Sequence, residues 1–306
     1  MKTAIRRGRV GAHAGWGVSS PGYLPPMPCS DVPDSPWRLL LLAGVTLLSV
    51  AVWPGVHEAP AAAAQTMTPM SDAARAELAP NGRLRAALNY SNFLLVSSRA
   101  PEHTGVAPDL ARELARRAGA AVEFVGYANA GLAADGANAQ AWDVAFIGAE
   151  PARADLITFT PAYVEIEATY LVPEHSTIRS TADVDHESVR IVSTARAAYT
   201  LFLQRTLRRA EIVEADGIDG ATALFERGGY DALAGLTPRL REDARRIPGM
   251  RLLPGRFTAV QQSIGVRKER QAAAAYLAAF GREIRTSGLL ARLIAEHKAD
   301  GLTIAR

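Results

Sequence analysis

The feature that most constrains this chain is the alternation of short apolar runs with helical patterns from Leu84 to His297. The apolar runs are rich in β-branched and small residues, which is typical of strands buried on both faces. Between them, stretches such as 109–118 place apolar residues at helical spacing. Repeated strand–helix–strand order predicts parallel sheets with helices on both faces, which is the α/β class.

The centre of this pattern is the stretch from Trp142 to Val172. It begins with a predicted buried strand, Val144–Ile147, turns at Gly148–Pro151 and presents one arginine, Arg153. It then returns through residues 158–161 into a long β-branched run. A strand that ends at a polar turn with a lone cation is well suited to hold an anion, because a guanidinium can donate two parallel hydrogen bonds to a carboxylate.

Two long crossover runs, near 164–172 and 257–264, divide the alternating pattern into two parts. Residues 80–168 together with 262–306 are predicted to form a first lobe, and residues 170–256 a second. Each lobe is expected to be a mostly parallel sheet flanked by helices. Ligands of open α/β sheets bind at the carboxyl ends of the strands, so we expect the ligand cleft between the lobes.

The first 64 residues differ from the rest. A basic residue, Arg38, precedes the apolar run Leu39–Val52, and an alanine-rich segment ends at Ala64. A basic flank, a short apolar core and small residues predict a secretory signal peptide within residues 1–64, cleaved near Ala64. The apolar run is shorter than the ~20 residues of a spanning helix. A retained membrane anchor is the alternative.

Composition excludes several classes of function. The formal net charge is only +3 and no basic patch dominates, so no nucleic-acid partner is expected. The single cysteine, Cys29, and the scattered histidines show no metal-ligand spacing, so neither a metal nor a cofactor is expected. No order of serine, histidine and aspartate, no phosphate-binding glycine loop and no paired-carboxylate motif stands out.

Arg153 is the first candidate for ligand binding. Its planar guanidinium can hold a carboxylate through paired hydrogen bonds. It follows the end of the predicted strand Val144–Ile147 closely enough to lie at the rim of the cleft. The spacing alone leaves a second interpretation open, in which Arg153 forms a salt bridge with Glu150 or Asp155.

The turn at residues 193–196 is the second candidate. It precedes a predicted helix that extends to about Arg209, and free N–H groups at the start of a helix favour an anion. Ser193 and Thr194 could assist with their hydroxyls, or they could simply cap the helix. Arg196 could point into the cleft or to solvent.

Further candidates follow the first predicted strand. Asn92 and Tyr90 could supply an amide contact and an apolar wall for a small ligand, although a turn-forming asparagine is an equal alternative. Glu150 and Gln262 are weaker candidates of the same kind. Two local expectations are also specific: Asp109 is predicted to cap a helix, and residues 126–140 to form a connection.

With these elements in place, the chain resembles the extracytoplasmic solute-binding proteins of ABC importers, family 3, which bind polar amino acids. The resemblance covers essentially residues 80–306. Four segments carry it. They are Gly105 with Asp109-Leu110 and its helix, the block of Asp143, Arg153, Phe159-Thr160 and Tyr163, the run Tyr230-Asp231-Ala232, and the terminal helices that follow Ile264-Gly265-Val266.

This resemblance implies a two-lobed type II periplasmic-binding fold that closes on a ligand and delivers it to a membrane permease. Arg153 matches the arginine that holds the ligand α-carboxylate in this family, and the turn at 193–196 matches its anion-binding turn. The implied protein is periplasmic and exported by a cleavable signal peptide, and we expect it to be monomeric.

The chain departs from the family pattern in two places. The turn between Asp143 and Arg153 is short and lacks the usual Thr/Ser run, and Leu236 stands where an acid usually receives the α-ammonium. A buried ammonium without an acceptor is costly. We therefore predict a carboxylate-bearing or amino-acid-like ligand that need not be a standard α-amino acid. The alternatives are a periplasmic enzyme resembling cyclohexadienyl dehydratases, with Glu150 as general acid, and a ligand-sensing module.

Overall fold

The computed structural model describes residues 68–306. The predicted signal peptide within residues 1–64, including the apolar run Leu39–Val52, lies outside the described residues. Within residues 68–306, every helix is too short or too polar to cross a bilayer.

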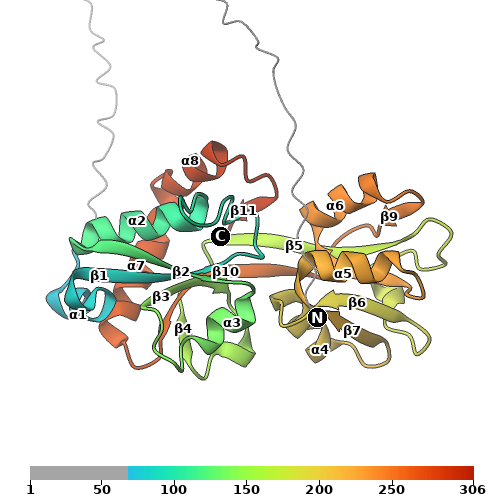
Figure 1. Ribbon diagram of the computed structural model, residues 1–306, viewed down its shortest axis with the longest axis horizontal. Helices are drawn as coiled ribbons and strands as arrows, with labels where there is room; N and C mark the ends of the chain where they lie inside the picture. Colours follow the sequence, from blue (N-terminus) through green and yellow to red (C-terminus); the bar gives the residue numbers. More distant parts are fainter. Residues whose placement is uncertain (1–67) are drawn as a thin grey trace, which may run out of the picture. The chain divides into compact units, whose positions relative to one another are not determined.

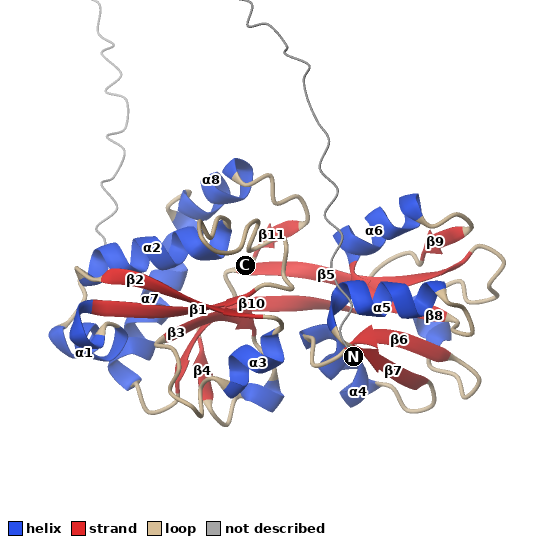
Figure 2. Ribbon diagram, in the orientation of Figure 1, coloured by secondary structure: helices blue, strands red, loops and turns tan. Residues whose placement is uncertain are grey.

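One mixed sheet runs through the described chain in the order β2-β1-β3-β10-β5-β8-β6-β7, with β4 beside β10, and β9 and β11 beside β5 (Figure 1). The strands are β1 Arg83–Asn89, β2 Ala121–Tyr127, β3 Val144–Gly148, β4 Ile157–Phe159, β5 Val164–Pro173, β6 Arg190–Thr194, β7 Glu211–Ala215, β8 Ala232–Leu236, β9 Met250–Leu252, β10 Thr258–Arg267 and β11 Leu302–Ile304. The long strands β5 and β10 pair antiparallel with each other and extend through both halves of the sheet (Figure 2).

On either side of these two strands the pairing is parallel. β1 pairs with β2 and β3 in the first lobe, and β6 pairs with β7 and β8 in the second. The helices are α1 Asp72–Leu78, α2 Val106–Ala118, α3 Ala130–Asp135, α4 Ala198–Thr206, α5 Gly217–Glu226, α6 Thr237–Arg246, α7 Gln271–Thr286 and α8 Leu289–Glu296, with short 3-10 turns at Pro80–Gly82, Pro151–Arg153 and Thr181–Val184. The predicted α/β fold of two lobes, each mostly parallel and flanked by helices, is confirmed.

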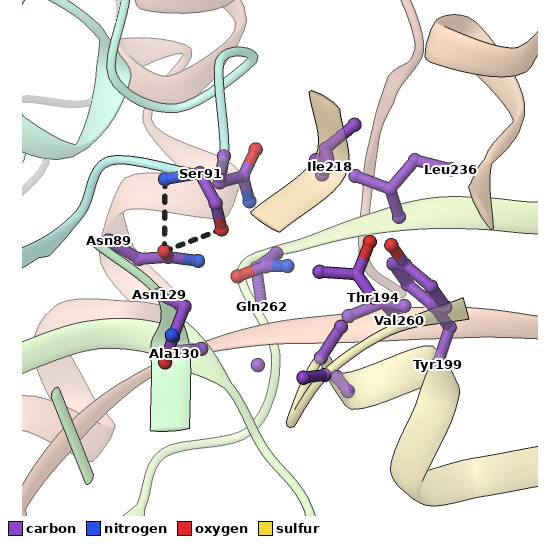
Figure 3. Close-up of a pocket in the computed structure, with 15 residues that line it drawn as sticks. Asn89, Ser91, Asn129, Ala130, Thr194, Tyr199, Ile218, Leu236, Val260 and Gln262 are labelled. Carbon is purple, nitrogen blue, oxygen red and sulfur yellow. Dashed lines mark hydrogen bonds between the residues drawn. The ribbon is translucent and has the colours of Figure 1, made fainter. Parts of the chain in front are cut away.

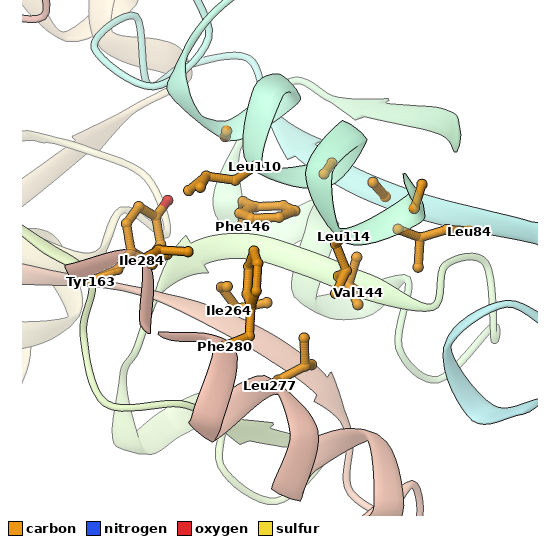
Figure 4. Close-up of a cluster of buried hydrophobic side chains, with 14 of the residues drawn as sticks. Leu84, Leu110, Leu114, Val144, Phe146, Tyr163, Ile264, Leu277, Phe280 and Ile284 are labelled. Atoms are coloured by element: carbon orange, nitrogen blue, oxygen red, sulfur yellow. The ribbon is translucent and has the colours of Figure 1, made fainter. Parts of the chain in front are cut away.

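Alternating residues of the first-lobe strands supply two separate cores, because successive side chains of a strand point to opposite faces. Val144 and Phe146 of β3 pack with Leu110 of α2 and Phe280 of α7 on one face (Figure 4). Ala145 and Ile147, one residue out of step, pack with the alanines of α3 on the other face. Helices therefore cover both faces, as the continuous apolar strands predict.

The second lobe repeats this construction. Ile191 of β6 packs with Leu203 of α4, whereas its neighbour Val192 packs with Phe225 of α5 and Leu240 of α6. A further cluster joins the lobes along β5 and β10, where Ile166 and Val260 meet residues of α4 and β8. The carboxyl ends of β1, β3, β6 and β8 thereby face the same region between the lobes.

Three local predictions are wrong. Asp109 does not cap α2, which begins at Val106 after Gly105, whose φ is 132°. A Cβ at Gly105 would come within 2.4 Å of the Leu95 carbonyl oxygen, so this cap requires glycine. Residues 126–140 are not a plain connection but contain α3, which is capped by the Asn129 side chain. α4 ends at Thr206, before the predicted Arg209.

Candidate functional site

A pocket lies between the lobes, at the carboxyl ends of their strands, and its volume is about 430 Å³ when the space open to solvent is included. The first lobe contributes the turn after β1, the start of α3 and the end of β3, and the second contributes the end of β6, the start of α4 and the end of β8 (Figure 3). The lining residues are Asn89, Ser91, Asn92, Asn129, Ala130, Gly148, Thr194, Ala195, Ala197, Ala198, Tyr199, Ile218, Leu236, Val260 and Gln262. We call this space the central pocket. Every residue in its lining is uncharged.

The polar side of the central pocket is made of amides. The Asn89 side chain already has partners close by in the chain, because its Oδ1 accepts hydrogen bonds from the Ser91 N–H at 3.1 Å and the Ser91 hydroxyl at 2.8 Å. The Asn129 side chain caps α3, where its Oδ1 accepts a hydrogen bond from the Leu132 N–H. Asn92 and Gln262 are different: they are only 3% and 4% exposed, and their side-chain oxygens have no hydrogen-bond partner within residues 68–306.

The opposite wall, from the second lobe and the crossover strand β10, is mostly apolar. Ile218, Leu236 and Val260 face the pocket together with Tyr199 (Figure 3). Burial raises the pKa of the Tyr199 phenol to about 12, so this side chain is neutral at physiological pH. A ligand in the central pocket therefore meets amides on one side and hydrocarbon on the other.

Arg153 ends the short 3-10 turn Pro151–Arg153 and is 5% exposed. Its Nη1 donates to the Gly148 carbonyl at 2.6 Å and its Nη2 to the Arg196 carbonyl at 3.0 Å. No carboxylate of the described chain lies within salt-bridge distance, so the alternative pairing with Glu150 or Asp155 does not form. Burial lowers the pKa of this guanidinium to about 10, which leaves it charged at neutral pH.

Arg153 lies beside the central pocket and is not part of its lining. It lines an adjacent pocket of about 470 Å³, a volume that includes space open to solvent, together with Arg196, Asp135 and apolar or small residues. Gly148 borders the central pocket next to Arg153: it lines the pocket, and a Cβ at this position would lie 3.0 Å from the Cβ of Ala198, another lining residue, and 3.8 Å from Arg153 Nη1. The buried cation therefore lies next to the amide-lined space at this residue.

Arg196 connects the lobes. Its Nη2 and Nη1 lie 2.7 and 2.8 Å from the two Asp135 carboxylate oxygens of α3, and Nη2 also donates to the Gly131 carbonyl at 3.1 Å. A Cβ at Gly131 would lie 2.5 Å from Arg196 Nε, so the close approach depends on glycine. We call these contacts the clasp. Neither predicted orientation of Arg196, into the cleft or to solvent, describes it fully, because its guanidinium binds Asp135 of the other lobe.

The remaining candidates lie around the central pocket with partners of their own. Glu150 pairs with Arg205 of α4 at 3.0 Å, a second charged contact between the lobes. Ser193 is fully buried and shares a 2.6 Å hydrogen bond with Thr200. Tyr90 hydrogen bonds through its hydroxyl to His103 Nε2 at 2.7 Å and lines a neighbouring opening of the cleft.

The structure thus brings Asn92, Gln262 and Thr194 together in the central pocket, with Arg153 directly behind Gly148. The alternative in which Ser193 or Thr194 caps α4 does not hold, because Ala197 is its N-cap and no side chain caps it. Within the described residues, no group of three or more histidine, cysteine, aspartate or glutamate side chains is arranged to hold a metal.

Sequence reasoning missed several lining residues. Asn89 ends β1, and Tyr199 lies in the first turn of α4. Asn129 belongs to α3, whose alanine and glycine residues give no apolar period to detect. The available signal was positional, because Asn89 stands at the carboxyl end of a strand, as ligand-binding residues of α/β folds do.

The comparison with protein families identifies this arrangement. Residues 86–299 match the model of the bacterial extracellular solute-binding proteins, family 3. The chain belongs to this family. The resemblance seen in the sequence is therefore confirmed. A comparison with curated protein sequences gives no significant match.

Solved structures of amino-acid-binding proteins share the two-lobed fold. A mutant of ArgBP from T. maritima matches with a TM-score of 0.62 and 21% identity, over 74% of this chain and 100% of that one. The arginine-bound binding protein AbpA from Streptococcus pneumoniae matches with a TM-score of 0.59 and 16% identity, over 72% and 96%. The ancestral amino acid-binding protein AncCDT-1, a precursor of cyclohexadienyl dehydratase, matches with a TM-score of 0.60 and 19% identity, over 72% and 98%.

Proposed function

We propose that this protein is the extracytoplasmic binding component of an ABC importer and that it holds a small carboxylate or amino-acid-like solute between its lobes. The observation that carries this proposal is Arg153, a buried cation with no carboxylate partner within residues 68–306. Removing a charge from water is costly unless an opposite charge or several hydrogen bonds compensate. Two carbonyls compensate only in part, and a solute carboxylate would complete the pairing.

The solute contacts are assigned from the geometry around Gly148. Arg153 holds the carboxylate, and Asn92, Gln262 and Thr194 contact the part of the solute inside the central pocket. The other candidates support the cleft without contacting the solute, because each makes a hydrogen bond or an ion pair with a protein group. They are Glu150, Ser193, Arg196 and Tyr90.

Relatives with the same fold bind amino acids: AbpA is bound to L-arginine, and a binding protein from Wolinella succinogenes is complexed with lysine. In the present chain the central pocket has no carboxylate to receive an α-ammonium, and Leu236 is one of its walls. The solute is therefore a carboxylate that need not be a standard α-amino acid.

Closure of the lobes is the mechanism of capture in this proposal. The hinge lies in the strands near 164–172 and 257–264, which connect residues 80–168 and 262–306 with residues 170–256. The clasp and the Glu150–Arg205 pair hold the lobes together on the side of the cleft where Arg153 lies. A membrane permease then receives the solute from this periplasmic protein, whose first 64 residues direct its export.

An enzyme is the second candidate, because AncCDT-1 is a precursor of a dehydratase. A dehydratase needs a general acid directed at its substrate. Glu150, the candidate for that role, is paired with Arg205 and does not line the central pocket. The geometry favours binding. Incubation with prephenate or arogenate tests the alternative directly, and formation of an aromatic product would overturn this choice.

The proposed function is tested by thermal-shift screening of amino acids and plain organic acids, followed by calorimetry on the compounds that bind. A ligand that binds only the native state raises the melting temperature by mass action. We expect carboxylates to be the compounds that do so. Nanomolar binding of an ordinary α-amino acid would contradict the absence of an ammonium acceptor, and binding confined to compounds without a carboxylate would contradict the role of Arg153.

A further inference from the structure

Asn92 and Gln262 lie in the wall of the central pocket with side-chain amide oxygens that have no hydrogen-bond partner within residues 68–306. Both are buried, and neither side chain makes a hydrogen bond to another group of residues 68–306. Buried polar side chains nearly always have partners. Asn89 and Asn129, in the same wall, follow that rule. Asn92 and Gln262 are therefore the two amides of this wall that remain able to hydrogen-bond a bound molecule.

The charge of the surroundings limits what these amides can recognise. Neither a carboxylate nor a cation lines the central pocket. The wall opposite the amides contains Ile218, Leu236, Val260 and the neutral Tyr199 phenol, besides Thr194 and three alanines. An ammonium group here would lose its hydration without gaining an opposite charge. A carboxamide or ureido group would lose less, because its N–H and C=O groups can pair with the two side-chain amides.

The carboxylate site is close enough for one small molecule to use both. Gln262 of β10 is paired with Gly148 of β3 in the sheet. Gly148 in turn lies against Arg153, whose Nη1 is 3.8 Å from the position of a Gly148 Cβ. A solute with its carboxylate at Arg153 therefore places groups only a few bonds away beside Gln262. Figure 3 shows the Gln262 amide between the first-lobe residues Asn89 and Ser91 and the second-lobe residue Thr194.

We propose that Asn92 and Gln262 make the central pocket selective for carboxylates that carry a neutral, hydrogen-bonding end, such as a carboxamide or a ureido group, over carboxylates that carry an ammonium. This inference rests on the proposed function, because it assumes that Arg153 holds the carboxylate. It deepens that function by naming the chemical class of the other end of the solute.

The test compares three probes of similar length: succinamate, which has a neutral amide, γ-aminobutyrate, which has an ammonium, and butyrate, which has neither. Their affinities for the full protein are measured by calorimetry or by ligand-observed NMR. We expect succinamate to bind at least about tenfold more tightly than either of the others, the loss that follows when buried amides stay unpaired.

A matched pair of variants locates the preference. Gln262→Met removes the amide from the pocket, whereas Gln261→Met removes the neighbouring amide, whose Nε2 donates to the Ala259 carbonyl and which does not line the central pocket. Gln262→Met should abolish the advantage of succinamate over butyrate, and Gln261→Met should keep it. Asn92→Asp should shift the preference toward γ-aminobutyrate, because it supplies the missing carboxylate. Melting curves without ligand show whether each variant is folded.

The outcomes separate this inference from the proposed function. Equal affinities for the three probes, or a preference for γ-aminobutyrate in the unmodified protein, would overturn the inference and leave carboxylate binding intact. A preference for succinamate that survives in both Gln262→Met and Asn92→Asp would also overturn it. If no probe binds at millimolar concentration, the inference is overturned, and the wider screen of carboxylates decides whether the proposed function fails with it.

Discussion

Neutralising the clasp should open the cleft. Asp135→Asn keeps the size of the side chain but removes the charge that Arg196 grips with two hydrogen bonds of 2.7 and 2.8 Å across the lobes. The protein should then populate open conformations more often in the absence of ligand. Lowering the pH has the same direction of effect, because the Arg196 hydrogen bond lowers the pKa of the Asp135 carboxyl. Clasp stability is complete above about pH 4 and is lost as pH falls through the lowered pKa.

The size of the effect follows from exposure. The Arg196 and Asp135 side chains are 46% and 58% exposed, and pairs of this kind contribute roughly 0.2–1 kcal/mol. Because Arg196 contacts both carboxylate oxygens of Asp135, the contribution of the clasp should lie near the upper end of this range, at about 1 kcal/mol. The ratio of open to closed protein should therefore rise about fivefold.

The assay is a distance distribution between spin labels on the two lobes, placed at the exposed positions Asn138 and Arg209. The chain has a single natural cysteine, Cys29, so engineered cysteines can be labelled after that one is replaced. Glu211→Gln is the matched control, because the Arg190–Glu211 pair lies within the second lobe at 46% and 59% exposure. If Asp135→Asn and Glu211→Gln give the same distribution as the unmodified protein, the clasp does not hold the lobes.

Three further predictions concern single side chains. Gly131→Ala should loosen the clasp as Asp135→Asn does, because its Cβ would lie 2.5 Å from Arg196 Nε; the same label pair measures it. Asp143→Asn should lower the free energy of unfolding by about 3 kcal/mol in urea titration, because the fully buried Asp143 carboxylate pairs with Arg85 and Arg270; the exposed Glu123→Gln should change little. Tyr199→Phe should reduce the loss of stability at high pH, since burial raises the pKa of this phenol to about 12 and its contribution disappears as pH rises from about 10 through that value.

Local patterns in the sequence predicted most of the fold. The strands at the centre of each lobe and α2 are visible because long apolar periods leave few alternatives. α3 was not visible, because residues 130–135 are small and its boundary is set by one asparagine cap. The capping of α2 by Gly105 could not be found either, since it depends on contact with Leu95.

The site was less predictable than the fold, because its contacts join residues far apart in the chain. Asn92, Gln262 and Thr194 follow strand ends or lie in a crossover strand, and position alone was enough to nominate them. The partners of Arg196 and Glu150 come from opposite lobes, at Asp135 and Arg205. No local pattern predicts such pairs. The prediction that no ammonium acceptor is present rests on one position, Leu236, which the structure places in the pocket lining.

The contact between Arg153 and a solute carboxylate is tested most directly by a thermodynamic cycle. Calorimetry measures the affinity of the unmodified protein and of Arg153→Met for the best carboxylate from the screen and for the corresponding primary amide. Loss of a buried ionic contact should weaken carboxylate binding by about 2–5 kcal/mol, or roughly 30-fold or more, and change amide binding far less. Equal carboxylate affinity in the two proteins, with both folded, would contradict the proposed role of Arg153.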